Sequence, residues 1–234
     1  MQSRNIPAQS CIIGLATSLG LGLLLGGCSL SSTPNYYTLS TTTKLTPSAA
    51  LRVIEVLPVS LPDRLDRVQM VIQDPAGQAK ILDLQRWTST LSSELHDSLS
   101  SGLQQQLGAV DRYSSGMATT QPVYRIGANF THFDLYGHSL IGGKMSGDAI
   151  DVAVTWTINR LESSAADATT KTSTLRPQLA CRMSFHLDAD SIASTGMSRT
   201  IALSRQAINK VSAAVTTSVL TYEGGAKPSD AVCI

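Results

Sequence analysis

The chain has 234 residues, of which 42% are hydrophobic and 15% are charged, and its formal net charge is +1 at pH 7. Without residues 1–27, which contain Arg4, 17 basic and 17 acidic residues remain. A neutral chain has no basic surplus to neutralise phosphates, so nucleic acid is excluded as the expected partner. The remaining length is typical of one domain and can bury a sizeable core.

The N-terminus has the three-part layout of a secretory signal. Arg4 precedes an apolar run, and Leu25-Gly26-Gly27 supply small residues at a cleavage point. Cys28 follows at once, as in a bacterial lipobox, where the thiol receives a diacylglycerol and the cysteine becomes residue one. We therefore expect residues 1–27 to be a lipoprotein signal peptide and Cys28 to be the lipidation site. The apolar run Ile12–Leu25 is shorter than the roughly 20 residues of a membrane span, which argues against a transmembrane helix. The remaining alternative is a plain signal peptide cleaved elsewhere.

Residues 28–35 are rich in Ser, Thr and Pro and are predicted to be a lipidated tether. One acyl chain anchors a protein only marginally, whereas two or more hold it stably. Ser29 follows the lipidation site, and an Asp at that position favours the inner membrane in Gram-negative bacteria. We therefore expect a lipid-anchored protein on the periplasmic face of the outer membrane.

Short strands are predicted in the first part of the folded chain. Tyr36–Leu39 is aromatic and β-branched, and Leu51–Val59 is apolar on both faces, which is typical of a central strand. Val68–Gln73 and Ala79–Leu84 flank the turn residues Asp74–Gly77, which predicts a hairpin.

From Thr88 the period changes to that of a helix. Leucines recur every four residues and form one apolar stripe, at positions 91, 95, 99, 103 and 107. Thr88 or Ser89 is expected to cap the start of this helix, and Gly108 is expected to end it.

Three alternating strands follow, each with one apolar and one polar face, over residues 124–131, 150–159 and 179–188. Polar connections are predicted over 137–147 and 162–177, and a second amphipathic helix from about 198 to 222. This order predicts an α+β fold, a mainly antiparallel sheet with two amphipathic helices packed on one face. Residues 36–223 are expected to form a single domain, followed by a C-terminal tail over 224–234.

Two cysteines remain in the mature chain besides Cys28. Cys181 falls on the apolar face of a predicted strand, and Cys233 stands next to the C-terminus. Because the expected compartment is oxidising, we expect a disulfide between them. The alternatives are two buried free thiols, or a flexible tail that does not bring Cys233 to Cys181. Their spacing suits no zinc site, which needs four clustered ligands.

No catalytic constellation emerges from the sequence. The segment Gly137–Gly142 resembles a nucleophile elbow only faintly, because its second glycine is one position late and a strand follows. Gly142-Gly143-Lys144 lacks the spacing of a phosphate-binding loop. We expect no enzyme, no cofactor and no metal. The alternative of a hydrolase would need Ser139 and His186 to converge.

The segment Leu61-Pro62-Asp63-Arg64-Leu65-Asp66-Arg67 alternates charge and leucine between two strands, and Pro62 cannot occupy a regular ladder position. It is either a solvated crossover or a docking loop at the end of the sheet. Tyr36 and Tyr37 must point to opposite faces of their strand, so one can be core and the other can meet a partner.

These residues carry a family resemblance. The lipobox Cys28, Tyr36-Tyr37-Thr38-Leu39, the segment from Leu61 to Val71, and Trp87 followed by Leu91 together resemble the ABC-type transport auxiliary lipoproteins, the PqiC/YmbA-like family. Arg64 stands where that pattern has an aromatic residue.

The resemblance implies a non-catalytic subunit of an MCE-type system that moves phospholipid between the two bacterial membranes. The implied partners are a periplasmic MCE-domain protein and inner-membrane transporter components, with assembly of several copies into a ring as a further implication. The implied contact residues are Tyr36, Tyr37, Leu61, Pro62, Asp63, Arg64, Leu65 and Arg67. A stand-alone lipid-binding or small-molecule-binding lipoprotein is the first alternative, and a periplasmic hydrolase is the second.

Overall fold

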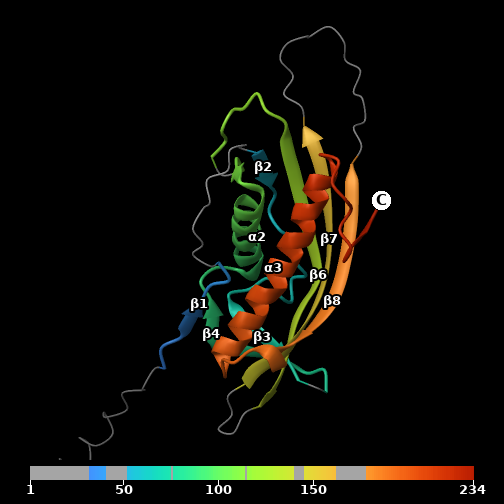
Figure 1. Cartoon of the computed structure of the whole chain (residues 1–234). Helices are drawn as coiled ribbons and strands as arrows, with labels where there is room; N and C mark the ends of the chain where they lie inside the picture. The colour runs from blue at the N-terminus through green and yellow to red at the C-terminus, as the bar shows by residue number, and fades with distance from the viewer. Residues whose placement is uncertain (1–31, 41–51, 75, 114, 140–144, 162–177) are drawn as a thin grey trace, which may run out of the picture. The chain divides into compact units, whose positions relative to one another are not determined.

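A long antiparallel hairpin forms the centre of the fold in this computed structural model (Figure 1). The structure describes residues 32–40, 52–74, 76–113, 115–139, 145–161 and 178–234, and residues 34–234 form one compact unit. The predicted signal peptide and Cys28 lie outside the described residues. The hairpin strands are β6 (Val123–Ser139) and β7 (Met145–Leu161), of 17 residues each.

The remaining strands of the nine-stranded sheet are β1 (Asn35–Tyr37), β2 (Arg52–Val56), β3 (Gln69–Gln73), β4 (Ala79–Trp87), β5 (Ala109–Asp111), β8 (Leu179–Asp188) and β9 (Val232–Cys233). Their order is β1-β4-β3-β6-β7-β8-β9, and β2 pairs with both β5 and β6. The β3–β4, β6–β7, β7–β8 and β8–β9 pairs are antiparallel, and the pairs made by β1 and β2 are parallel. β2 therefore lies between two neighbours, as its apolar sequence predicted.

The hairpin is longer than its predicted strands. Residues 137–147 were expected to be a loop, but Gly137 pairs with Gly147 and His138 with Ser146, so the ladder continues into this region. Because antiparallel pairing needs only backbone groups, polar and glycine residues can extend a strand that its hydrophobic pattern no longer marks.

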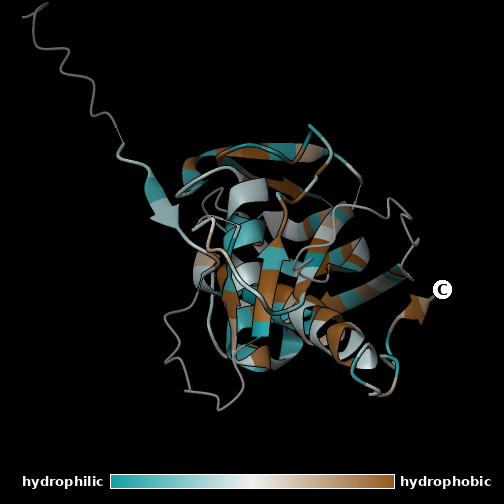
Figure 2. Cartoon of the chain, turned by 90° about the horizontal axis from the view of Figure 1, so that it is seen from above, coloured by the Kyte–Doolittle hydropathy of each residue, from teal (hydrophilic) through white to brown (hydrophobic). Residues whose placement is uncertain are grey.

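Two helices cover one face of the sheet, which confirms the predicted α+β architecture (Figures 1 and 2). They are α2 (Leu91–Leu107) and α3 (Met197–Thr221), the latter preceded by the short 3₁₀ helix η1 (Ala189–Ser191). All five stripe leucines of α2 are buried. Gly108 ends α2 in the left-handed conformation, with φ 59°, as predicted.

The two helices pack closely where glycine leaves room. A Cβ on Gly102 of α2 would lie 2.9 Å from the Oγ of Ser212 on α3, which is closer than real Cβ contacts. Gly102 therefore has a packing function in the middle of the helix. Beneath the helices, the core is filled by Trp87, Trp156, Phe130 and Phe133, each at most 1% exposed.

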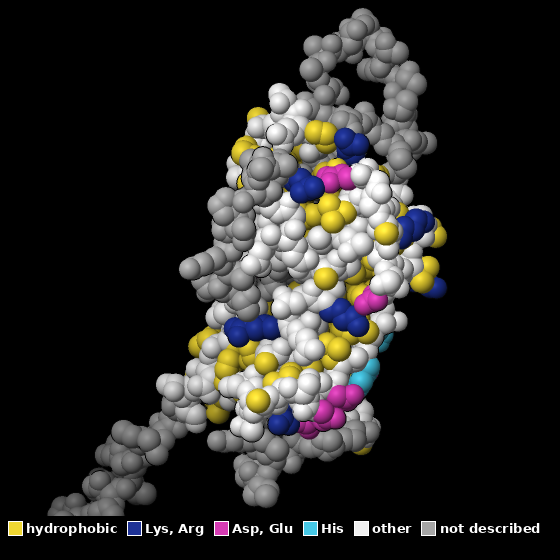
Figure 3. Space-filling view, in the orientation of Figure 1, with side chains coloured by type: hydrophobic (Ala, Val, Ile, Leu, Met, Phe, Trp, Pro, Cys, Tyr) yellow, Lys and Arg dark blue, Asp and Glu magenta, His cyan; other side chains and the backbone are white. Residues whose placement is uncertain are grey.

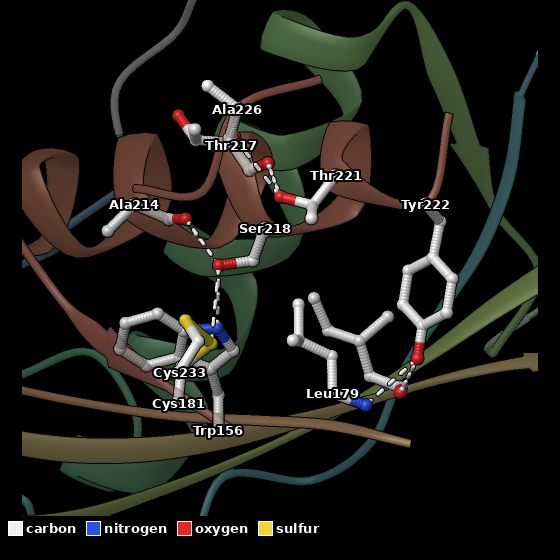
Figure 4. Close-up of a disulfide and its surroundings, with 11 residues drawn as sticks. Trp156, Leu179, Cys181, Ala214, Thr217, Ser218, Thr221, Tyr222, Ala226 and Cys233 are labelled. Carbon is white, nitrogen blue, oxygen red and sulfur yellow. Dashed lines mark hydrogen bonds between the residues drawn. A yellow bond between two sulfur atoms is a disulfide. The ribbon is translucent and has the colours of Figure 1, made fainter. Parts of the chain in front are cut away.

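The C-terminus returns to the sheet as β9, which the sequence did not predict. Cys181 of β8 and Cys233 of β9 are directly opposite each other and form a disulfide. Figure 4 shows this bond beneath Ser218 of α3, whose Oγ accepts a hydrogen bond from the indole Nε1 of Trp156 at 3.2 Å. Ile234 exchanges backbone hydrogen bonds with Ala180, so the last residues extend the ladder.

Removing this disulfide by Cys233→Ser should lower the free energy of unfolding by about 4 kcal/mol, because the bond closes a loop across a sequence separation of 52 residues. Urea denaturation with and without dithiothreitol measures the effect. The reductant should lower the denaturation midpoint of the wild type and leave that of Cys233→Ser unchanged. Asp230→Ala, which removes a surface ion pair of the same tail with Lys210, is the control. A wild-type denaturation midpoint that is the same with and without dithiothreitol would contradict the expectation.

Candidate functional site

The segment that follows the predicted tether is fastened to the domain by β1. Tyr37 pairs with Trp87 of β4, its hydroxyl donates to Oε1 of Gln85 at 2.9 Å, and its carbonyl accepts a hydrogen bond from the backbone N–H of Thr88. Leu39 is only 1% exposed and belongs to the core. Tyr36 points to the other face of the strand and is 58% exposed. The two tyrosines thus divide as the sequence predicted, one against the domain and one in solvent.

A buried carboxylate holds the same segment from the helix side. Glu94 on the first turn of α2 is 3% exposed, and its Oε2 accepts hydrogen bonds from Thr38 Oγ1 at 2.9 Å and from the backbone N–H of Leu39 at 2.8 Å. Its Oε1 accepts from the hydroxyls of Thr88 and Ser89. We call this arrangement the Glu94 clamp.

The clamp also explains a difference at the start of α2. Thr88 or Ser89 was expected to cap the helix, but the N-cap residue is Thr90, and its side chain makes no capping hydrogen bond. Thr88 and Ser89 donate to Glu94 instead. The helix amide of Ser92 is capped from outside by Asp66 Oδ1 at 3.2 Å, which places a negative charge at the positive end of the helix.

The hydrogen bonds of the clamp favour the ionised form of Glu94. Burial alone would raise the pKa of this carboxyl group, but hydrogen bonds from Thr88, Leu39, Thr38 and Ser89 together outweigh burial and lower the pKa below its ordinary value of 4.5. The clamp is therefore an anionic acceptor at neutral pH, surrounded by donors.

The crossover segment 61–67 packs against the same end of α2. It forms a tight turn in which the carbonyl of Pro62 accepts hydrogen bonds from the backbone N–H groups of Leu65 and Asp66. The carbonyl of Arg67 accepts a hydrogen bond from the N–H of Leu91, the first residue of α2. The two segments singled out in the sequence, far apart along the chain, therefore meet around the start of this helix.

One residue of the crossover bridges to the sheet. The guanidinium of Arg64 binds the carboxylate of Asp134 on β6 through two N–O contacts of 3.0 and 3.2 Å. Asp134 is 2% exposed and also bonds to Gln73 Nε2 at 3.1 Å and His132 Nδ1 at 2.7 Å. Bidentate pairing fixes the guanidinium plane, so Arg64 holds the turn on the sheet while half of its side chain stays exposed.

The structure thus separates the predicted contact residues by exposure. Leu65 is 4% exposed and part of the core, so it supports the turn from below. The other predicted residues fall into two groups: Tyr36, Asp63 and Arg64 are exposed, and Tyr37, Leu61, Pro62 and Arg67 are half-buried.

Glu94 and Asp134 were missed by the sequence analysis. Each is a single acid in a strand or helix with an amphipathic pattern, and the partners that link it to the predicted segments lie 55 and 70 residues away. The only local signal was the cluster of hydroxyl residues immediately before α2, which is normally a sign of helix capping.

The residues of the hydrolase alternative do not come together. Ser139 pairs with Met145 of β7, whereas His186 pairs with Asp151 further along the same strand. Positions 145 and 151 of one strand are roughly 20 Å apart. His186 is hydrogen-bonded instead by Asp151 at 2.6 Å and Asp188 at 3.1 Å, and these bonds raise its pKa.

Among the described residues, no group of three or more His, Cys, Asp or Glu side chains is placed to hold a metal ion. Within the same residues, neither helix combines the length and apolar character needed to cross a membrane.

Comparison with known proteins matches residues 37–216 to a family model described as the ABC-type transport auxiliary lipoprotein component. The fold is shared with the crystal structure of an uncharacterized protein, at 19% identity and a TM-score of 0.55, covering 80% of this chain and 99% of that one. It is also shared with a Xanthomonas campestris protein of family DUF330, at 14% identity and a TM-score of 0.50, covering 81% and 98%. No curated protein matches the chain.

Replacing the clamp carboxylate tests its contribution to stability. Glu94→Ala leaves buried donors without an acceptor and should lower the free energy of unfolding by about 2–3 kcal/mol at pH 7. Because folding lowers the pKa of Glu94, its stabilising effect is complete above pH 4.5 and is lost as the pH falls through the folded-state pKa. The difference between wild type and Glu94→Ala should therefore shrink in acid.

Urea denaturation over a pH series measures this difference. Asp97→Asn is the matched control, because Asp97 lies on the same helix with a side chain that is 67% exposed. It should change stability by less than about 0.5 kcal/mol. An equal loss for both variants, or a Glu94→Ala deficit that does not change below pH 4.5, would contradict the clamp.

Proposed function

Because this chain belongs to the ABC-type transport auxiliary lipoprotein family, we propose that it is a non-catalytic subunit of an ABC/MCE-type system for intermembrane phospholipid transport. The family match over residues 37–216 is the observation that carries this proposal. In it, acyl chains on Cys28 anchor the protein to the periplasmic face of the outer membrane. The folded domain docks the periplasmic MCE-domain protein there, and through it the inner-membrane components.

The Glu94 clamp supports a protein that is anchored through Cys28 and docks its partner with the folded domain. The chain from Cys28 enters the fold at β1, where backbone pairing, Glu94 and the buried Leu39 hold it. The guanidinium of Arg205 on α3 also donates to the carbonyl of Thr38 at 2.8 Å. A load applied to the acylated end is thus distributed to the sheet and both helices, as a tethered docking protein requires.

We place the partner contact around the start of α2, on the exposed residues Tyr36, Asp63 and Arg64 and the half-buried Pro62, and call this the docking surface. Its geometry is fixed from below by Leu65 in the core and by the pairing of Arg64 with Asp134. A rigid turn that presents an aromatic ring and both signs of charge loses little side-chain freedom on binding.

A stand-alone lipid carrier is the second candidate. An open apolar depression of about 350 Å³ on β7, β8 and β9, lined in part by Val232 and Ile234, favours it. A monomer that co-purifies with a stoichiometric lipid and captures no MCE-domain protein would support the carrier and contradict the docking proposal.

Anchoring is tested with Cys28→Ala. The variant should lose membrane attachment, because the acyl chains supply the binding energy, and should lose transport function while its domain keeps the wild-type melting temperature. Membrane fractionation, circular dichroism and an assay of outer-membrane phospholipid content measure these properties. Full function of Cys28→Ala in cells would remove anchoring from the mechanism.

The docking surface is tested with Asp63→Ala. Loss of one contact of about 1 kcal/mol should reduce cross-linked capture of the MCE-domain protein from intact cells about fivefold, at unchanged melting temperature. Asp97→Ala on the exposed side of α2 is the control and should capture as much partner as the wild type. Equal capture by the wild type, Asp63→Ala and Asp97→Ala would contradict the docking role and favour the interpretation of residues 61–67 as a solvated crossover.

A further inference from the structure

The β3–β4 hairpin exposes apolar side chains that no contact within the domain explains. Ile81 is 44% exposed and Leu84 is 42% exposed, and both belong to β4. Its turn is fixed, because Asp74 Oδ1 accepts hydrogen bonds from the N–H groups of Ala76 and Gln78. In Figure 3, hydrophobic side chains gather at the lower left of the molecule, where Figure 1 draws β1, β4 and the start of α3.

Cationic side chains accompany these apolar ones. Lys80 precedes Ile81, and Arg86 follows Leu84 by two residues, whereas Asp83 is the one acid of the strand. Among the ion pairs of the described residues, neither Lys80 nor Arg86 has a carboxylate partner. Exposed aliphatic residues beside basic ones with free charge are typical of surfaces that meet an anionic lipid interface.

The strand pairing gives this surface a direction. β1 runs parallel to β4, with Asn35 beside Gln85. The chain before Asn35 and the β4 residues before Gln85 therefore extend from the β1–β4 pair in the same direction. Cys28 stands seven residues before Asn35, which limits its distance from β1 to about 25 Å. The hairpin thus projects from the end of the domain that the acylated residue tethers.

We propose that the β3–β4 hairpin rests on the bilayer that holds the acyl chains of Cys28. Ile81 and Leu84 enter the headgroup region, and the amino group of Lys80 and the guanidinium of Arg86 bind lipid phosphates. The inference rests on the acylation stated under the proposed function. It adds a second membrane contact that fixes the orientation of the domain.

The opposite edge of the sheet provides an internal control. Val232 on β9 is 62% exposed and Ile234 is 87% exposed, so this pair is at least as apolar and accessible as the hairpin pair. β9 and β1 are the two ends of the strand order, which puts them roughly 30 Å apart. Apolar exposure alone would bring both pairs to a membrane, whereas the tether favours only the hairpin.

The test measures which surface lies at the bilayer. The acylated protein, carrying a fluorophore on Ala79→Cys or, as control, on Ser184→Cys of β8, is reconstituted into vesicles of phosphatidylethanolamine and phosphatidylglycerol with nitroxide-labelled headgroups. We expect nitroxide quenching at position 79 to exceed that at 184 at least about threefold. Ile81→Ser with Leu84→Ser should reduce quenching at 79 by about half, and Val232→Ser with Ile234→Ser should not change it.

Equal quenching at positions 79 and 184 while the protein stays on the vesicles would overturn the hairpin contact and leave the proposed function intact. Shielding of position 79 only after an MCE-domain protein is added would assign the hairpin to that partner and overturn the bilayer contact. Loss of the wild-type protein from the vesicles would overturn the acylation and the hairpin contact together.

Discussion

The hydrogen bonds of Glu94 join the N-terminal segment to the rest of the molecule. A carboxylate that is 3% exposed accepts four hydrogen bonds, two from residues 38 and 39 and two from residues 88 and 89. Such a buried charge is tolerated only when its acceptor capacity is filled, so the segment and the helix start must stay together. The proposed anchoring depends on this junction, because acyl chains on Cys28 would pull on the chain immediately before it.

The two ends of the strand order, β1 and β9, are secured by different chemistry. β1 is a three-residue edge strand held by the Glu94 clamp, and β9 is a two-residue edge strand held by the disulfide of Cys181 and Cys233. Short edge strands leave little unpaired backbone for unwanted pairing with other chains. Between them, the β6–β7 hairpin and the two helices form the rigid body on which the turn at residues 62–66 is mounted. The arrangement suits a protein that acts by contact.

The larger elements were predictable because their hydrophobic pattern repeats over enough residues to identify a helix or a strand. The leucine stripe of α2, the alternation in β6, β7 and β8, and the glycine that ends α2 all appear where the pattern placed them. β5 and β9 were missed because two or three residues carry no period. Residues 137–147 were assigned to a loop because they are polar, yet backbone pairing extends the strands through part of them.

The site was predictable in outline and not in its chemistry. The odd composition of residues 61–67 and the tyrosine pair marked two segments, and the fold brings both to the start of α2. The acids that support them, Glu94 and Asp134, could not be identified from the sequence, because their bonds to these segments span 55 and 70 residues. The burial of Leu65 also depends on the tertiary fold, since its local pattern is that of an exposed turn.

The measurement that tests the account most directly is the mass of the N-terminal peptide of the protein isolated from its membrane. We predict a peptide that begins at Cys28 and carries the added mass of a diacylglycerol and an amide-linked fatty acid. An unmodified amino terminus, together with release of the protein by a low-salt wash, would contradict it.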